Sequence, residues 1–224
     1  KKNIGDKGNI YEVVAADNYE WGRMEDNTWI AMTYVKLDEG LCFDALKPYA
    51  ARLPAERQQK IARYRFEQDK LLSLAAGLLI RRAVGESALY FGAHGKPYAE
   101  NGVWFSVSHS GRIAAIAVSE HEVGLDVEQI PDESRLKLAE RFCHPGEQAY
   151  IAAADDKRLA FCEIWTRKEA YAKHTGEGLR ALSKIDTVTL EDEGYIRFFD
   201  CQIGTILVSV CAPRGTEILQ NHLL

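Results

Sequence analysis

The order of strand-like and helical segments is the sequence feature that most constrains the fold. The 224-residue chain runs through a strand, helices and strands, and then goes through that order a second time. This pattern predicts an α+β protein with two halves, residues 1–119 and 120–224, joined near residues 118–122. The halves show no close sequence repeat, so any internal symmetry would be a symmetry of fold only.

In the first half, the strongest pattern is the apolar run KLLSLAAGLLIRRAV at 70–84, which predicts a largely buried helix. Pro54 has the position of a residue in a first helical turn and predicts the start of an earlier helix. Residues 1–28 are polar and give little pattern. Strands are expected at 29–38, 103–109 and 112–120.

The second half begins with EVGLDVEQI, in which apolar and polar residues alternate as in a strand with one buried face. Helical patterns follow, and the chain then returns to strand patterns. Helices are expected within 132–142, 145–153 and 157–176. Strands are expected at 185–190, 195–202 and 205–213.

The composition, 46% hydrophobic and 27% charged, is that of an ordinary globular protein. The longest apolar run, residues 71–80, is too short to span a bilayer, and the first residues lack the apolar core of a signal peptide. The five cysteines show no paired or metal-type spacing, which is typical of reduced thiols in a cytoplasmic protein. The net charge of −5 argues weakly against a nucleic-acid binder.

Two carboxylates, Asp126 and Glu128, share one face of the strand EVGLDVEQI. Like charges at this spacing shift each other's pKa, so the pair needs a compensating cation or a proton. Glu169 and Lys173, four residues apart on one helix, could place a third acid beside the pair. Three such acids suit Mg²⁺. A solvated strand face and an ordinary Glu–Lys helix pair would give the same pattern.

Ser108 and His109 lie at the end of a predicted strand. A serine nucleophile with a histidine base is one interpretation, but adjacent strand residues point to opposite faces and the chain has no G-x-S-x-G elbow. Hydrogen bonding of both residues to an anion fits better, and a histidine with only structural partners at a turn stays open.

Residues 47–82 hold nine lysines and arginines against three acids. Arg57 and Lys60 are three residues apart on one side of a helix, which suits a single phosphate better than a long nucleic-acid backbone. A solvated basic face is the alternative. An RNA platform with interleaved aromatic residues is not visible.

Four segments occur in an order that resembles the Sfp-type 4′-phosphopantetheinyl transferases: GKPY, WFSVSHSG, VGLDVE and WTRKEAYAKHTGEGL. The resemblance covers roughly residues 50–180 and leaves the first 45 residues unexplained. It implies transfer of the phosphopantetheine arm of coenzyme A to a serine of an apo acyl or peptidyl carrier protein. It also implies Mg²⁺ dependence, release of adenosine 3′,5′-bisphosphate and a monomer. The implied fold has two similar α+β halves related by a pseudo-twofold axis, with the active site in the cleft between them.

The resemblance also implies roles for individual residues. The implied metal ligands are Asp126, Glu128 and Glu169. The implied catalytic residues are Glu169 as the preferred base, Glu147 as the second choice of base, and Lys173 beside the departing group. The implied contacts to coenzyme A are Arg57 and Lys60 at the 3′-phosphate, Ser73, Lys96 and Pro97 near the adenosine, and Ser108, His109, Asp126 and Lys173 near the phosphates.

Three other functions are compatible with parts of the sequence. A serine hydrolase would use Ser108 and would be labelled there by a fluorophosphonate. A non-catalytic binding module would be expected to lack part of the acid set, yet Asp126, Glu128, Glu169 and Lys173 are all present. A nucleic-acid binder would use the basic stretch and show a steep salt dependence.

Overall fold

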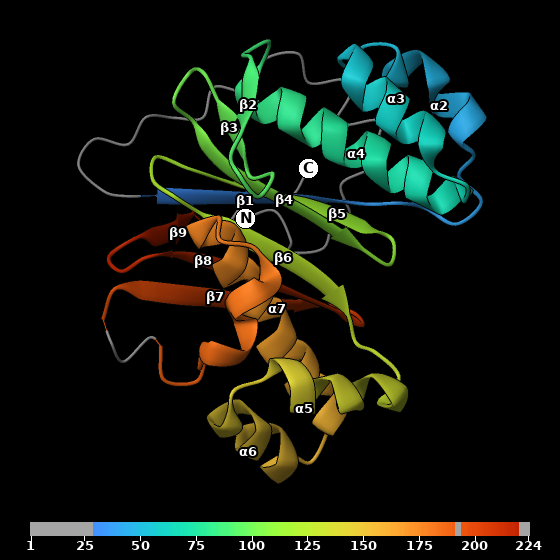
Figure 1. The fold of residues 1–224 in the computed structure, drawn as a ribbon. Helices are drawn as coiled ribbons and strands as arrows, with labels where there is room; N and C mark the ends of the chain where they lie inside the picture. Colours follow the sequence, from blue (N-terminus) through green and yellow to red (C-terminus); the bar gives the residue numbers. More distant parts are fainter. Residues whose placement is uncertain (1–28, 191–193, 220–224) are drawn as a thin grey trace, which may run out of the picture.

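The computed structural model describes residues 29–190 and 194–219, which fold into two main sheets of mostly antiparallel strands with helices against them (Figure 1). This mixture of helices and antiparallel strands confirms the α+β class. In Figure 1, helices α2, α3 and α4 lie in the upper part of the molecule, and helices α5, α6 and α7 lie in the lower part.

The first sheet has the strand order β4-β5-β1-β9, in which β5 pairs antiparallel with both β4 and β1. A separate two-stranded hairpin, β2–β3, lies between the last helix of this part and β4. The strands are β1 (Trp29–Lys36), β2 (Leu89–Phe91), β3 (Pro97–Ala99), β4 (Trp104–Ser110) and β5 (Ile113–Ser119). The helices are α2 (Phe43–Ala50), α3 (Ala55–Arg63) and α4 (Glu67–Val84).

The second sheet has the order β6-β8-β7 and is antiparallel throughout. Its strands are β6 (Gly124–Gln129), β7 (Ile196–Ile203) and β8 (Ile206–Pro213). The α-helices of this part are α5 (Ala139–Phe142), α6 (Pro145–Ala153) and α7 (Lys157–Thr175). Two 3₁₀ helices accompany them, η1 (Glu133–Leu138) and η2 (Leu179–Lys184).

Two of the apolar clusters lie on the two faces of the first sheet. Helix α4, which is buried along most of its length, packs with Phe105, Ile116 and Val118 on one face of the first sheet. The opposite face packs against β6 and β8, which contribute Leu125 and Val208 to the second cluster. Within the described ranges, no helix combines the length and apolar character needed to cross a membrane.

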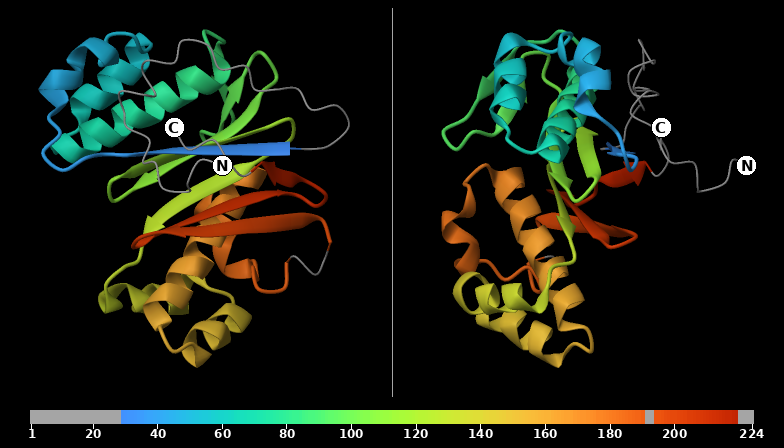
Figure 2. Two further views of the ribbon diagram at one scale, coloured as in Figure 1. Left: turned by 180° about the vertical axis from the view of Figure 1, so that it is seen from behind. Right: turned by 90° about the vertical axis from the view of Figure 1, so that its right-hand side faces the viewer.

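The end of the described chain returns to the first sheet. After β8, strand β9 (Glu217–Leu219) pairs in parallel with β1, so the first sheet contains the first and the last strand of the described chain (Figure 2). A short segment after Ser119 carries the chain from β5 in the first sheet to β6 in the second. The two sheets are therefore linked covalently at two places.

One predicted strand is wrong: within residues 185–190, residues 187–190 form a turn and 185–186 have no regular structure. Asp186 accepts a hydrogen bond from Val188 N through its side chain and from Leu190 N through its carbonyl, which closes the backbone on itself. Thr187 is buried and bonds through its amide and hydroxyl to Glu147. Hydrogen bonds within the segment and to Glu147 therefore hold it in a turn and not in a strand.

Candidate functional site

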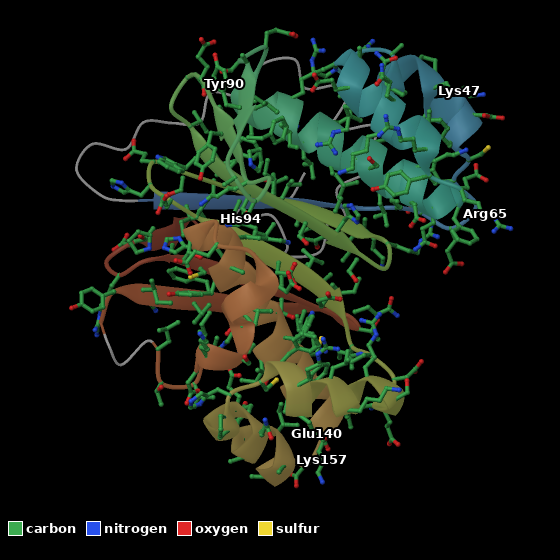
Figure 3. All side chains as sticks on the ribbon, in the orientation of Figure 1. Lys47, Arg65, Tyr90, His94, Glu140 and Lys157 are labelled. Carbon is green, nitrogen blue, oxygen red and sulfur yellow. The ribbon has the colours of Figure 1, made fainter. Side chains whose placement is uncertain are left out.

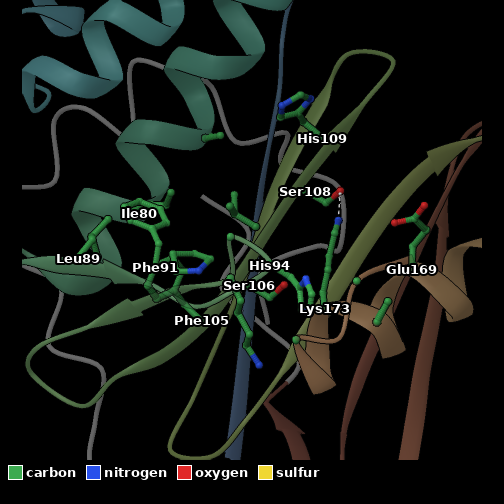
Figure 4. A pocket seen from close by; sticks show the side chains of 18 of the residues that line it. Ile80, Leu89, Phe91, His94, Phe105, Ser106, Ser108, His109, Glu169 and Lys173 are labelled. Atoms are coloured by element: carbon green, nitrogen blue, oxygen red, sulfur yellow. Dashed lines mark hydrogen bonds between the residues drawn. The ribbon is translucent and has the colours of Figure 1, made fainter. Parts of the chain in front are cut away.

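A cavity of about 480 Å³ lies between β4, the β2–β3 loop, helices α3 and α4, and helix α7 (Figure 4). Its walls therefore come from both parts of the chain. Most of the residues singled out in the sequence line it: Arg57, Lys60, Lys96, Pro97, Ser108, His109, Glu169 and Lys173.

The alternation of β4 distributes its polar residues between two sides of the cavity. Ser108 pairs in register with Ala115 and His109 with Ala114, so the two side chains point to opposite faces of the sheet, as predicted. Ser108 faces α7 and β6, whereas His109 points away from this contact (Figure 4). His109 is thus not available to Ser108 as a base, which argues against the serine hydrolase.

On the Ser108 side, three polar groups converge. Lys173 Nζ lies 2.7 Å from Asp126 Oδ1 and donates to Ser108 Oγ at 2.9 Å. The Ser108 hydroxyl donates to the same Asp126 oxygen at 2.9 Å. Asp126 is only 4% exposed, so the ammonium of Lys173 compensates a buried carboxylate.

Two further acids lie near this cluster. Burial raises the pKa of Glu169 to about 7, with smaller contributions from the charges of Asp126 and Glu128 and an opposing one from Lys173. Burial and the charge of Asp126 also raise the pKa of Glu128. Glu169 is therefore close to half-protonated at neutral pH and able to exchange a proton.

On the His109 side, the cavity is cationic. Arg57 and Lys60 come from the same side of α3, and burial lowers the pKa of both side chains. The pKa of His109 is lowered mainly by partial shielding of the imidazole from water. The positive charges of Lys173, Lys60 and Arg57 lower it further. Cations that lower the pKa of the neighbouring Lys60 and His109 form a site that favours an anion.

The far end of the cavity is closed by a contact between the β2–β3 loop and the end of α7. Lys96 Nζ donates to the His174 carbonyl at 2.5 Å and lies over the ring of Trp104. Gly176 ends α7 in a left-handed conformation, and a side chain there would press on Lys96. Lys96 thus bonds to the last turn of α7, and its predicted contact with a nucleotide stays a prediction.

Comparisons with known proteins agree with this arrangement. Residues 122–213 match the family model of the 4′-phosphopantetheinyl transferase superfamily. A 4′-phosphopantetheinyl transferase of Bacillus subtilis is 30% identical over 158 residues, which cover 65% of this chain and 70% of that protein. The AcpT transferase of Salmonella typhi is 36% identical over 147 residues, or 62% and 75% of the two chains. The chain belongs to the 4′-phosphopantetheinyl transferase superfamily. The gsp transferase of Aneurinibacillus migulanus is 32% identical over 160 residues and 67% of each chain. The protein is an enzyme, a 4′-phosphopantetheinyl transferase.

In this transferase, Asp126 has one oxygen that suits a cation. Its Oδ2 is buried and has no hydrogen-bond partner among the described residues, whereas Lys173 occupies Oδ1. The described residues nevertheless bring no three Asp, Glu, His or Cys side chains close enough together to hold a metal ion. Asp126 therefore fits Mg²⁺ by its donor chemistry, and Glu128 and Glu169 as further ligands stay predictions.

Glu147 of the transferase lies outside the cavity, within the packing of α6 and α7. Glu147 and Lys168 form an ion pair at 2.5 Å, and both side chains are 0% exposed. The Glu147 carboxylate also accepts from His144 N at 2.7 Å and from the Thr187 amide and hydroxyl at 2.9 and 2.8 Å. A carboxylate so enclosed cannot reach a carrier serine, so this placement argues against Glu147 as a base.

The basic stretch of the transferase divides in space. Arg57 and Lys60 face the cavity, but Lys47 is exposed and pairs with Asp44 at the periphery, and Arg65 is also peripheral (Figure 3). The sequence pattern had not separated these two groups. Ser73 is fully buried in α4 and does not line the cavity, so its contact with adenine stays a prediction.

Sequence reasoning missed several residues of the cavity wall. Phe91 and His94, from the β2–β3 hairpin, line the cavity together with Gly176 and Gly178 beyond α7. The glycines lie within WTRKEAYAKHTGEGL, one of the four segments that carry the family resemblance. The hairpin was not predicted as strands because each of its strands has only three residues.

Proposed function

We propose that this transferase moves the 4′-phosphopantetheine arm of coenzyme A to a serine of an apo acyl or peptidyl carrier protein, with Mg²⁺, and releases adenosine 3′,5′-bisphosphate. One observation carries the proposal. A single cavity has the cations Arg57, Lys60 and His109 at one side and the Ser108–Lys173–Asp126 cluster with Glu169 at the other. A nucleotide with several phosphates and a reacting diphosphate needs both kinds of surface.

The cationic side would bind the adenosine end of coenzyme A. Arg57 and Lys60 are placed to hold the 3′-phosphate, and His109 would donate to a phosphate oxygen. Binding of the anion would reverse the pKa depression of His109, so the phosphate would be attracted more strongly as the imidazole becomes protonated.

The acidic side would carry the reaction. The carrier serine attacks the β-phosphate, a phosphorus–oxygen bond forms, and the diphosphate bond to the departing adenosine bisphosphate breaks. Glu169, whose pKa is about 7, accepts the serine proton directly or through a water molecule. Lys173 and Ser108 donate hydrogen bonds to the phosphates. A Mg²⁺ ion held by Asp126, Glu128 and Glu169 would supply charge neutralisation at the diphosphate.

The same proposal covers the architecture and the partners. Residues 1–119 and 120–224 would be two similar halves with pseudo-twofold symmetry, although β9 crosses back to the first sheet. A monomer would suffice because one chain supplies both walls of the cavity. The five reduced cysteine thiols fit a cytoplasmic enzyme, and neither a membrane nor a nucleic acid is a proposed partner.

The test is to incubate the protein with an apo carrier, coenzyme A and Mg²⁺ and to measure the carrier by intact-protein mass spectrometry. We expect one phosphopantetheine on the carrier serine. The Asp126→Ala variant should show no transfer while remaining folded by circular dichroism. An unmodified carrier with the wild-type enzyme would refute the proposed reaction, and normal turnover by Asp126→Ala would refute the role of the acid cluster.

A further inference from the structure

The two sheets meet along the edge strands β4 and β6, which belong to different sheets. Ser106, Ser108 and Ser110 alternate along β4, and all three point toward β6 because alternate residues of a strand share a face. Serine side chains, and not a continuous backbone ladder, therefore make the bonds across this junction.

The outer two serines bind the backbone of β6. Leu125 N donates to Ser106 Oγ at 2.9 Å, and Gln129 N donates to Ser110 Oγ at 3.1 Å. Strand β6 pairs with β8 through its other edge, so these two amides depend on β4 for partners. Two bonds four residues apart fix both the separation of the strands and the register of β6 along β4.

These bonds enclose the acid pair. Asp126 directly follows Leu125, and Glu128 directly precedes Gln129. A one-residue slip of β6 would turn both carboxylates to the opposite face, and a smaller shift would separate Asp126 from Ser108 and Lys173. The position of the acids thus depends on hydroxyl groups that lie on the other sheet.

We propose that Ser106 and Ser110 are positioning residues for phosphopantetheine transfer: their hydroxyls hold β6 in the register that sets Asp126 against Ser108 and Lys173 of the cavity wall, with Glu128 two residues further along the strand. This inference rests on the proposed function. Both serines act through β6. Ser106 Oγ is bonded to the Leu125 amide, and Ser110 Oγ is bonded to the Gln129 amide and also donates to Glu128 Oε2 at 3.5 Å. The cations of α3 and the imidazole of His109, on the opposite face of β4, do not depend on these bonds.

The test compares Ser106→Ala and Ser110→Ala with the wild type in steady-state transfer assays. Loss of register should lower kcat about 10-fold, since small misplacements of reacting groups have effects of this size or larger. The KM for coenzyme A should change less than about twofold, because the cationic side stays intact. Ser110→Thr retains the hydroxyl and should restore kcat.

Ser87→Ala is the matched control. It removes the same kind of bond, from Asn101 N to Ser87 Oγ at 3.0 Å, outside the cavity. We expect wild-type kinetics for this variant. A KM increase at constant kcat in the β4 variants, or equal impairment of Ser110→Thr and Ser110→Ala, would overturn the proposal.

A second measurement separates this inference from the proposed reaction. Isothermal titration calorimetry measures the binding of Mn²⁺ to the enzyme in the absence of coenzyme A and carrier. The Mn²⁺ affinity should be about tenfold weaker in both alanine variants, because this is the usual effect of losing a group that orients metal ligands. Equal affinities in the wild type and the variants would overturn the positioning role, even if the wild type transferred nothing. Ser110 is only half-buried, so Ser110→Ala decides the question if Ser106→Ala does not fold.

Discussion

At the scale of single residues, Glu169 shows how a functional group can oppose stability. Its pKa is raised from 4.5 to about 7, mainly by burial and then by Asp126 and Glu128. The folded protein therefore binds this proton more tightly than the unfolded chain does. The stability that Glu169 contributes is fully present below about pH 4.5 and is lost as the pH rises through about 7.

We expect Glu169→Gln to raise the Tm in metal-free buffer at pH 8, because the neutral amide removes a buried charge from beside two acids. The difference should disappear toward pH 4, and kcat should fall at least about 100-fold because the base is lost. Thermal unfolding across this pH range and transfer assays are the measurements. Glu140→Gln, on the exposed surface of α5, is the control; a lower Tm for Glu169→Gln at pH 8 would contradict the argument.

The sequence predicted some of these residue environments and not others. Strand alternation alone placed Ser108 and His109 on opposite faces, because that rule depends only on local geometry. The burial of Glu147 could not be predicted, since it depends on Lys168 and Thr187, which lie 21 and 40 residues further along the chain. From the sequence, the Glu147 carboxylate is a possible base, but in the folded protein it is enclosed.

At the scale of elements, the contact between α7 and β6 requires a glycine. A Cβ atom at Gly124 would lie 1.9 Å from the Ala170 carbonyl and 2.5 Å from His174 N, both backbone atoms of α7. A side chain at this position would push the helix that carries Glu169 and Lys173 away from the strand that carries Asp126.

We therefore expect Gly124→Ala to lower the free energy of unfolding by about 3 kcal/mol, at the upper end of overpacking effects, and to lower kcat. Urea unfolding and transfer assays measure the two effects. Gly92→Ala is the control, because its nearest neighbour is a Tyr98 side-chain atom at 3.1 Å, which can move. Equal stability losses at the two positions would show that the close approach of α7 is not required.

The buried Glu147–Lys168 pair connects α6 to α7 and to the turn at 185–190. Lys168→Met would leave a buried carboxylate without its cation and should lower the free energy of unfolding by about 3–5 kcal/mol. Glu147→Gln, assayed below its Tm, should retain kcat per folded molecule because this group does not reach the cavity. Lys47→Met, at an exposed pair, should change stability little. A large loss of kcat in folded Glu147→Gln would restore Glu147 as a candidate base.

This turn also shows why secondary structure was predicted incompletely. Residues 185–190 have a strand-like composition, but the Asp186 side chain and carbonyl close a turn, and Glu147 holds Thr187 in the interior. The hairpin β2–β3 was missed because each strand has only three residues. Longer elements such as α4 and α7 were predicted well, since their pattern extends over several turns.

At the scale of the whole molecule, the two parts of the chain supply different chemistry to one cavity. Arg57, Lys60 and His109 come from the first part, and Glu169 and Lys173 come from the second. The sequence predicted both sets of residues. It could not predict that β4 and β6 lie side by side, because that contact joins two sheets through serine hydroxyls and follows no pairing pattern.

This division predicts different kinetic effects for substitutions in the two parts. Lys60→Ala should raise the KM for coenzyme A about 10-fold and weaken inhibition by adenosine 3′,5′-bisphosphate to a similar extent. The kcat should stay within about twofold of the wild-type value, because the lost contact is equally strong in the ground state and the transition state. Added salt should raise the KM of the wild type more than that of the variant, since one screened charge is already absent. Lys47→Ala removes an equal charge from an exposed position on α2 and should leave the KM unchanged. Equal KM values for Lys60→Ala and Lys47→Ala, or a loss confined to kcat, would show that the nucleotide is not held by the α3 side of the cavity.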